Sequence, residues 1–302
     1  MSYILTLVSR DRSLAQAHLD ICERYLADES ASTNNVFRAD PEWLAPEKSI
    51  DLFIAQKPGR SQLTALRKEL AQSGIDSFIV PEENRKKKLL IADMDSTILS
   101  CETLDEVAAA LGLKDKVSEI TEKAMRGELD FHDAIRERVA MLKDLPESEV
   151  LDVLGQMTFN PGAKEMVQTF RKTGMITILV SGGFTQFAEW AAVRCGFDHV
   201  HSNRLDIDAG KLTGRVREPI LDGETKRDLL IHYARIYDIS LEDTLAVGDG
   251  ANDIKMLKQA GLGVGYQPKP KVAKSMANNI YQTDLMSLAY IQGYKDHDIL
   301  SE

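Results

Sequence analysis

Two aspartates interrupt an otherwise apolar stretch, "LLIADMDSTIL", at residues 89–99. The apolar residues are typical of a buried strand, and Asp93 and Asp95 stand two positions apart at its end. Burying a carboxylate is costly unless it is paired with a cation, hydrogen-bonded or bound to a metal. The pair therefore predicts a site of chemistry at the end of this strand.

Polar residues and glycines also follow two later apolar runs. Ser181, Gly182 and Gly183 come after "MITILV", and the segment "GDGAND" at 248–253 comes after "TLAV". Ligands of doubly wound sheets bind beyond the carboxyl ends of the strands, so we expect these groups to gather at one edge. Lys226, at the start of a helical segment between them, adds a positive charge.

The residue types at this edge suit a phosphate group held beside a divalent cation. Oxygens of Asp93, Asp95 and Asp249 are the hard ligands that Mg²⁺ prefers, and Mg²⁺ keeps several waters for a phosphate partner. The Ser181 hydroxyl and the glycine N–H groups after it can donate hydrogen bonds to phosphate oxygens. Lys226 is expected to offset part of the phosphate charge.

The two aspartates also suit two distinct roles in phosphate transfer. A carboxylate can attack phosphorus and form an aspartyl-phosphate, and a second acid can protonate the leaving group. Strand alternation places residues i and i+2 on one side, so Asp93 and Asp95 are expected to reach one centre. We expect Asp93 to stay ionised beside the metal and Lys226, and Asp95 to favour its neutral form.

The elements that must position these residues begin at Leu89, where apolar strands start to alternate with amphipathic helices. This pattern predicts an α/β fold, a doubly wound and Rossmann-like parallel sheet, over residues 85–302. Residues 101–160 carry only helical patterns, too long for an ordinary strand-to-helix connection, and are interpreted as a helical cap inserted over the strand ends. Residues 202–218 are expected to form a hairpin that turns at "DAGK".

Residues 1–84 form a separate compositional unit. Three strand-like and two helical runs, in the order β-α-β-α-β, predict a small α+β domain, with a ferredoxin-like fold as one option. Its expected role is regulation or oligomerisation, so a homodimer is a further expectation. The charged run "EENRKKK" at 82–88 is interpreted as a solvated linker.

Composition narrows the class of protein. The 302 residues carry 37 basic and 47 acidic side chains, a net charge of −10, which argues against nucleic acid as a partner. Three widely spaced cysteines predict free thiols in a reducing compartment. Neither a signal peptide nor an apolar run of membrane-spanning length is evident, so we expect a cytoplasmic protein without a membrane partner.

The four motifs, "DMDSTIL" (93–99), "SGG" (181–183), Lys226 and "GDGAND" (248–253), resemble those of the haloacid dehalogenase superfamily and follow its order. The resemblance implies Asp93 as nucleophile and Asp95 as general acid and base. It further implies Mg²⁺ held by Asp93, the Asp95 carbonyl and Asp249. By the same resemblance, Ser181, Gly182 and Lys226 would bind the phosphate. Asn252 would contact the substrate or the surroundings of the phosphate. Asp253 would orient Lys226 or the metal waters.

The insertion "EITEKAMRGELDFHDAIRERVAMLKDLP" at 119–146 resembles the cap of the superfamily members that hydrolyse O-phosphoserine. The resemblance implies that Glu102 pairs with the substrate ammonium and Arg138 grips its carboxylate, for which a bidentate guanidinium is suited. It also implies that Met125 and Phe131 close over the site. The implied reaction is hydrolysis of O-phospho-L-serine to L-serine and phosphate, the last step of serine biosynthesis.

Other interpretations stay open at this point. The catalytic motifs equally fit a related phosphatase or phosphotransferase that acts on another small phosphorylated metabolite. A non-enzymatic amino-acid sensor, with the N-terminal domain as the binding module, is a second alternative. Met125 and Phe131 could be ordinary core residues, and Arg138 could be a surface arginine paired with Glu137.

Overall fold

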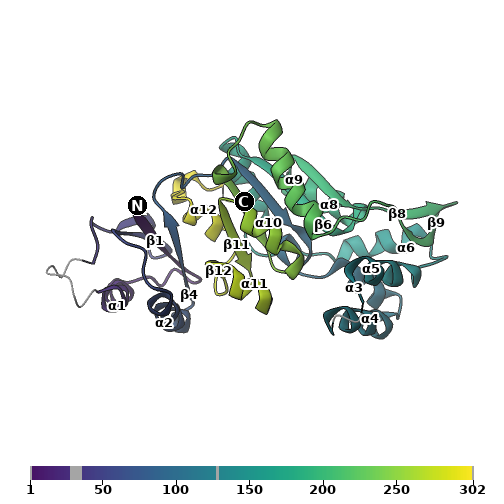
Figure 1. Cartoon of the computed structure of the whole chain (residues 1–302), viewed down its shortest axis with the longest axis horizontal. Coiled ribbons are helices and arrows are strands. Elements are labelled where there is room, and N and C mark those ends of the chain that lie inside the picture. Colours follow the sequence, from purple (N-terminus) through teal and green to yellow (C-terminus); the bar gives the residue numbers. More distant parts are fainter. Residues whose placement is uncertain (1, 28–35, 127–128, 301–302) are drawn as a thin grey trace.

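The computed structural model describes residues 2–27, 36–126 and 129–300 (Figure 1). A four-stranded antiparallel sheet lies at one end, a six-stranded parallel sheet occupies the middle, and the helices of residues 103–152 lie at the other end. The α/β class, with its helical insertion and N-terminal α+β region, is therefore confirmed. Among these described residues, no helix is both long and apolar enough to cross a bilayer.

The N-terminal sheet has the strand order β2-β3-β1-β4, and the chain order is β-α-β-β-α-β, as in ferredoxin-like folds. The sequence pattern missed β2, because it is a short edge strand in which Trp43 is exposed and only the last two residues are buried. The elements are β1 (Tyr3–Ser9), α1 (Gln16–Leu26), β2 (Glu42–Ala45), β3 (Ser49–Ile54), α2 (Arg60–Leu70) and β4 (Ile75–Pro81).

All neighbouring strands of the central sheet are parallel, in the order β12-β11-β10-β5-β6-β7. The strand carrying the two aspartates, β5, therefore lies between β10 and β6, the strands that end in the other predicted motifs. The strands are β5 (Leu89–Asp93), β6 (Ile176–Phe184), β7 (His199–Asn203), β10 (Thr244–Gly248), β11 (Leu262–Tyr266) and β12 (Asn278–Ile280).

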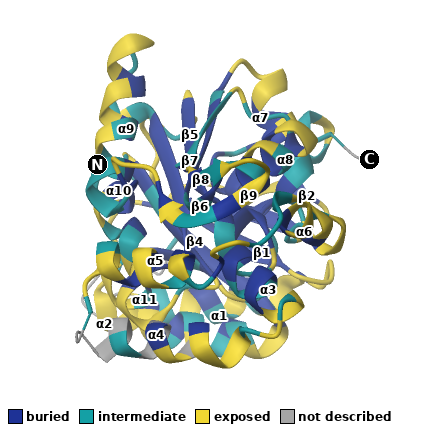
Figure 2. Cartoon of the chain, turned by 90° about the vertical axis from the view of Figure 1, so that its right-hand side faces the viewer, coloured by how far each residue is buried: buried dark blue, intermediate teal, exposed yellow. Residues whose placement is uncertain are grey.

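Helices cover both faces of this sheet, as the near-continuous apolar strands predicted. Leu89 and Ile91 pack in one cluster with residues of α9 and α10, and Leu90 and Ala92 pack in another with residues of α7 and α8. Figure 2 shows the strands as largely buried, with exposed residues on the outer surfaces of the helices. The helices are α7 (Ala163–Lys172), α8 (Thr185–Cys195), α9 (Gly223–Ile236), α10 (Ile254–Gln259), α11 (Pro270–Ser275) and α12 (Ser287–Ile291).

The insertion forms four helices beyond the carboxyl ends of the strands: α3 (Thr103–Ala110), α4 (Lys114–Arg126), α5 (Phe131–Ala140) and α6 (Glu147–Asp152). The expected hairpin is present as β8 (Leu205–Asp208) and β9 (Lys211–Val216). Backbone bonds join this hairpin to the insertion, from Asp144 N–H to the Leu212 carbonyl at 2.9 Å and from Leu212 N–H to the Leu145 carbonyl at 2.8 Å. The hairpin thus extends the cap.

Two buried aspartates connect the N-terminal sheet to the rest of the chain. Asp51 on β3 forms an ion pair with Arg85 at 2.5 Å, and the Arg85 side chain is only 13% exposed. Asp76 on β4 accepts hydrogen bonds from the backbone N–H groups of residues 281–283. The interpretation of 82–88 as a solvated linker is therefore wrong at Arg85, because its guanidinium has a buried partner 34 residues earlier.

Candidate active site

Asp93 is the last residue of β5 and is 4% exposed. Its Oδ1 accepts hydrogen bonds from the Met94 N–H at 2.8 Å and from Lys226 Nζ at 2.5 Å. Within the described residues, no hydrogen bond occupies its second oxygen, Oδ2. The chain then turns sharply, and Ser96 has a positive φ of 57°. Such a conformation is uncommon outside glycine and concentrates at functional sites.

This turn places Asp95 at the junction of the sheet and the cap. Asp95 Oδ1 accepts a hydrogen bond from the Thr103 N–H at the start of α3, at 2.8 Å. Its Oδ2 accepts one from the Ser181 hydroxyl at the end of β6, at 3.0 Å. Because β5 ends at Asp93, the turn positions Asp95, and strand alternation is the wrong reason for its placement.

Lys226 is fully buried and bridges two acids. Its Nζ lies 2.5 Å from Asp93 Oδ1 and 2.7 Å from Asp253 Oδ1. Asp222 starts α9 by accepting a hydrogen bond from the Thr225 N–H at 2.9 Å, and this fixes the helix turn that carries Lys226. Asp253 is 0% exposed, and its Oδ2 accepts a bond from the Gly250 N–H at 3.0 Å. Its contact with Lys226 fits the expected orienting role.

The "SGG" segment is shaped around Asp95. The Ser181 hydroxyl donates to Asp95 and accepts a bond from the Gly183 N–H at 2.8 Å. A Cβ on Gly183 would lie 2.8 Å from Asp95 Oδ2, closer than real Cβ atoms approach, so a side chain there would displace the Asp95 carboxylate. A Cβ on Gly182 would meet Phe131 of the cap at an ordinary 3.5 Å. Ser181 and Gly183 therefore lie beside Asp95, and Phe131 of the cap lies beside Gly182.

Asp249 follows β10 and pairs with a lysine that the sequence analysis missed. Lys269 Nζ lies 3.0 Å from Asp249 Oδ2 and 3.1 Å from Glu102 Oε1. Glu102 also accepts a hydrogen bond from the Ser96 hydroxyl at 2.8 Å. The sequence signal for Lys269 is weak, because a lysine directly before Pro270 reads as an ordinary helix start.

The predicted cap residues, Arg138, Phe131 and Met125, differ in their burial and in how much of their surroundings the structure describes. Arg138 on α5 is half-buried, and burial lowers its pKa, although Asp105, Glu102 and Asp95 act in the opposite direction. In the described part of the chain it has no ion pair with Glu137, so the alternative of a surface pair is not observed. Phe131 is 37% exposed, which is not core packing. Met125 lies in α4, but its side chain is outside the described part of the structure.

Asn252 lies beside the start of α9. A Cβ on Gly223 would come within 2.6 Å of its carbonyl oxygen, and a Cβ on Gly250 within 2.4 Å of its Oδ1. The loop after β10 therefore packs directly against the helix that carries Lys226. Among the described contacts, the Asn252 side chain makes no hydrogen bond, and a role in substrate contact stays a prediction.

Known proteins resemble this chain in sequence and fold. The pattern of the haloacid dehalogenase-like hydrolase family matches residues 90–258. The chain belongs to this family. A phosphoserine phosphatase of Archaeoglobus fulgidus is 38% identical over 253 residues, which cover 83% of this chain and 73% of the relative.

Solved structures agree with the family membership. A HAD family hydrolase from Salmonella enterica serovar Typhi has a TM-score of 0.85 and 28% identity, and covers 96% of this hydrolase and 98% of its own chain. A structure described as a phospho-aspartyl intermediate analogue of phosphoserine phosphatase has a TM-score of 0.64 and 40% identity, covering 68% of this hydrolase and 98% of its own chain.

Burial dominates the electrostatics of the hydrolase site. It raises the pKa of Asp93, with the charge of Asp253 adding to the effect and Lys226 opposing it. It also raises the pKa of Asp95, helped by Glu102 and opposed by its hydrogen bonds. The pKa of Asp249 rises to about 6, although Lys269 acts against the rise. Burial thus raises the pKa of Asp93 as well as that of Asp95, whereas the sequence predicted a preference for the neutral form at Asp95 alone.

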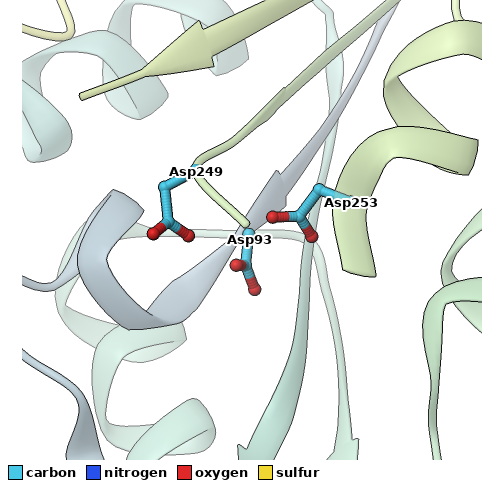
Figure 3. Close-up of side chains that lie close together, drawn as sticks. All are labelled: Asp93, Asp249 and Asp253. Atoms are coloured by element: carbon cyan, nitrogen blue, oxygen red, sulfur yellow. The ribbon is translucent and has the colours of Figure 1, made fainter. Parts of the chain in front are cut away.

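The three acids of the hydrolase's strand ends form a donor set that fits a metal ion. Asp93, Asp249 and Asp253 each offer an oxygen within 4.8 Å of the others, and Figure 3 shows Asp249 and Asp253 on either side of Asp93. Lys226 is shared by Asp93 and Asp253, and Lys269 is shared by Asp249 and Glu102, so two positive charges face four carboxylates. A hard divalent cation would supply the missing charge.

Proposed function

We propose that this hydrolase converts O-phospho-L-serine to L-serine and phosphate through a phosphorylated Asp93. The observation that carries the proposal is the buried Asp93–Lys226 pair, with Asp95 held beside it, under a cap that presents one acid and one arginine. The relatives named above, phosphoserine phosphatases among them, support the same reaction.

The first step uses the free oxygen of Asp93. Oδ1 is held by Met94 and Lys226, which leaves Oδ2 to attack phosphorus. As the new P–O bond forms, the bond from phosphorus to the serine oxygen breaks, and Asp95 gives that oxygen its proton. The raised pKa of Asp95 suits this role, because it favours the protonated acid before the step.

The second step reverses the role of Asp95. Its carboxylate takes a proton from water as the water oxygen attacks the phosphorus of phospho-Asp93, and the bond from phosphorus to Oδ2 breaks. Phosphate leaves and both aspartates return to their starting states. Lys226, whose pKa is raised by Asp253 and Asp93 against the effect of burial, stays charged and offsets the oxygens of the transferring group.

Three groups are proposed to hold the metal: the Asp93 and Asp249 carboxylates and the Asp95 carbonyl. Both oxygens of Asp253 already accept hydrogen bonds, from Lys226 and Gly250, so Asp253 is assigned to orienting Lys226. Mg²⁺ bound there would lower the charge repulsion between Asp93 and the incoming phosphate.

The selectivity proposal rests on Glu102 and Arg138. Glu102 already accepts the ammonium group of Lys269 at 3.1 Å, so its position suits the ammonium of an amino acid. Arg138 has no ion pair among the described residues and lies in the field of Asp105 and Glu102, so a substrate carboxylate would supply the anion it lacks. Ser181 and Gly182 are assigned to the phosphate.

A matched substrate panel tests this assignment. Phosphate release is measured with and without Mg²⁺ from O-phosphoserine, from phosphoethanolamine, which lacks the carboxylate, and from 3-phosphoglycerate, which has a hydroxyl in place of the ammonium. Arg138→Gln should raise KM for phosphoserine by about 10- to 100-fold and leave phosphoethanolamine almost unaffected. Glu102→Gln should raise KM for phosphoserine by a similar factor and leave 3-phosphoglycerate, which has no ammonium group, almost unaffected. Equal turnover of all three substrates by the wild type would contradict the proposal.

The finer predictions rest on the same reaction. Phospho-Asp93 chemistry also fits a phosphatase or phosphotransferase for another small phosphorylated metabolite, and the panel separates these from phosphoserine hydrolysis. Release of no phosphate from any substrate would favour the amino-acid sensor instead. A place at the end of serine biosynthesis, a cytoplasmic location, a homodimer and a regulatory role for residues 1–84 stay predictions.

A further inference from the structure

Two side-chain contacts join the cap helix α5 to the segment just before α9. His132 Nε2 lies 3.2 Å from Asp222 Oδ2, and an Arg136 guanidinium nitrogen lies 2.7 Å from Glu218 Oε1. These residues are separated by 82 to 90 positions in the sequence. The steps proposed above use none of the four, so the contacts need a separate explanation.

The two ends of the His132–Asp222 contact carry different parts of the site. On α5, Phe131 precedes His132 and Arg138 lies less than two turns further along. On the other side, Asp222 caps α9 with Oδ1 and accepts the Lys226 N–H on its carbonyl at 3.0 Å. The Asp222 carboxylate thus joins α5, which carries Arg138, to the first turn of α9, which carries Lys226.

We propose that His132 is a positioning residue, whose contact with Asp222 holds α5 and its Arg138 in register with Lys226 at the start of α9. This role rests on the proposed function, because it concerns the fit of a substrate that spans both groups. His132 itself touches no reacting atom. The Arg136–Glu218 pair adds a second tie one helical turn along α5.

The charges around His132 suit this tie. Acids face it from both sides, Asp222 and Glu218 from the segment before α9 and Asp130 from the start of its own helix, while Arg136 adds one positive charge. The segment before α9 thus presents two acids to two nitrogen-bearing side chains of α5, and both contacts hold the same pair of elements together.

Asp222 responds to the same contact. Burial acts to raise its pKa, but its hydrogen bonds from Thr225 and His132 outweigh burial and lower it. These contacts therefore favour the charged carboxylate of Asp222, the form that accepts both hydrogen bonds.

The kinetic test compares His132→Ala with the wild type. Alanine keeps α5 helical and removes the ring that contacts Asp222. The contact joins partly exposed side chains and is worth little, so KM for phosphoserine should rise only about two- to fivefold, with kcat unchanged. His297→Ala, at an exposed histidine near the C-terminus, is the matched control. Equal KM values for wild type and His132→Ala would overturn the proposal.

Asp222→Asn extends the test, since asparagine also caps helices and lets α9 form. Because both substitutions remove the same contact, the double variant His132→Ala/Asp222→Asn should raise KM no further than Asp222→Asn alone. Additive effects would mean that the two residues act independently and would contradict the tie.

A readout without substrate separates this proposal from the proposed function. Amide hydrogen exchange in α5, measured at residues that do not adjoin position 132, should be faster in His132→Ala than in the wild type and unchanged in His297→Ala. If phosphoserine is not hydrolysed but exchange behaves in this way, the proposed function fails and the tie stands. Equal exchange in the wild type and His132→Ala overturns the tie.

Discussion

Buried aspartates at the contact with the N-terminal sheet and at the active site have very different surroundings. At the contact with the N-terminal sheet, Asp51 and Asp76 are 1% and 5% exposed; at the strand ends, Asp93 and Asp249 are both 4% exposed. Asp51 receives the Thr6 hydroxyl and both nitrogens of a guanidinium fork. Asp76 Oδ2 alone receives four hydrogen bonds.

The acids of the active site share their donors instead. One lysine serves Asp93 and Asp253, another serves Asp249 and Glu102, and a raised pKa marks both Asp93 and Asp249. The aspartates are therefore equally buried at the two places, but only those at the N-terminal contact have a full set of hydrogen-bond donors. A carboxylate whose donors are complete fixes the structure, whereas one that lacks a counter-charge is ready to bind a cation or to react.

The largest expected effect separates function from stability at Asp93. Asp93→Asn removes the attacking oxygen and should lower kcat by at least about 10³-fold. The free energy of unfolding should not fall by more than about 1 kcal/mol, because Lys226 keeps Asp253 and one buried negative charge is removed. Phosphate release and urea unfolding measure the two quantities. Near-normal turnover would remove Asp93 from the role of nucleophile.

At Asp51 we expect the opposite result, a large loss of stability with little change in turnover. Asp51→Ala leaves the Arg85 guanidinium buried without its carboxylate, and breaking such a pair destabilises by about 3–5 kcal/mol. Turnover per folded molecule should stay within about twofold of the wild type. Asp206→Ala is the control, since Asp206 has comparable arginine partners but is more exposed and should lose about 1 kcal/mol or less. Equal losses in urea unfolding would show that burial does not decide the cost.

The sequence predicted most residues of the active site but few features of the contact with the N-terminal sheet. The order of the four motifs along the chain and the parallel sheet were enough to place Asp93, Ser181, Lys226 and Asp249 at one edge. Such motifs are local, and the topology of a parallel sheet brings strand ends together without further information. The short edge strand β2 escaped because two buried residues make too weak a pattern.

Residues whose meaning depends on a distant partner were not predicted. Lys269 pairs with Glu102, which lies 167 positions earlier, and no local pattern identifies that acid. Arg85 stands in a charged run that is typical of a solvated segment, yet its partner is buried in another sheet. Positions of this kind follow from packing between elements, which a single sequence does not reveal.

The pKa of Asp249 predicts a stabilising substitution inside the active site. Its folded-state pKa is raised from 3.8 to about 6, so the folded protein binds a proton more tightly than the unfolded chain. This costs stability progressively as pH rises from about 4 to 6, by up to about 3 kcal/mol above pH 6. Without metal, Asp249→Asn should recover up to that amount at pH 8 and almost nothing near pH 4. A loss of stability at pH 8 would mean that Lys269 fully compensates the charge.

The smallest expected effect comes from the same aspartate-to-asparagine change at Asp76, and it lowers the free energy of unfolding. Asp76→Asn keeps an oxygen that can accept the N–H groups of residues 281–283 and the Thr283 hydroxyl, but loses the negative charge that strengthens these bonds. The free energy of unfolding should fall by about 1–2 kcal/mol at pH 8, where Asp249→Asn raises it. Urea unfolding of both variants under one set of metal-free conditions makes the comparison. Two shifts of the same sign would show that the supply of donors does not distinguish the N-terminal contact from the active site.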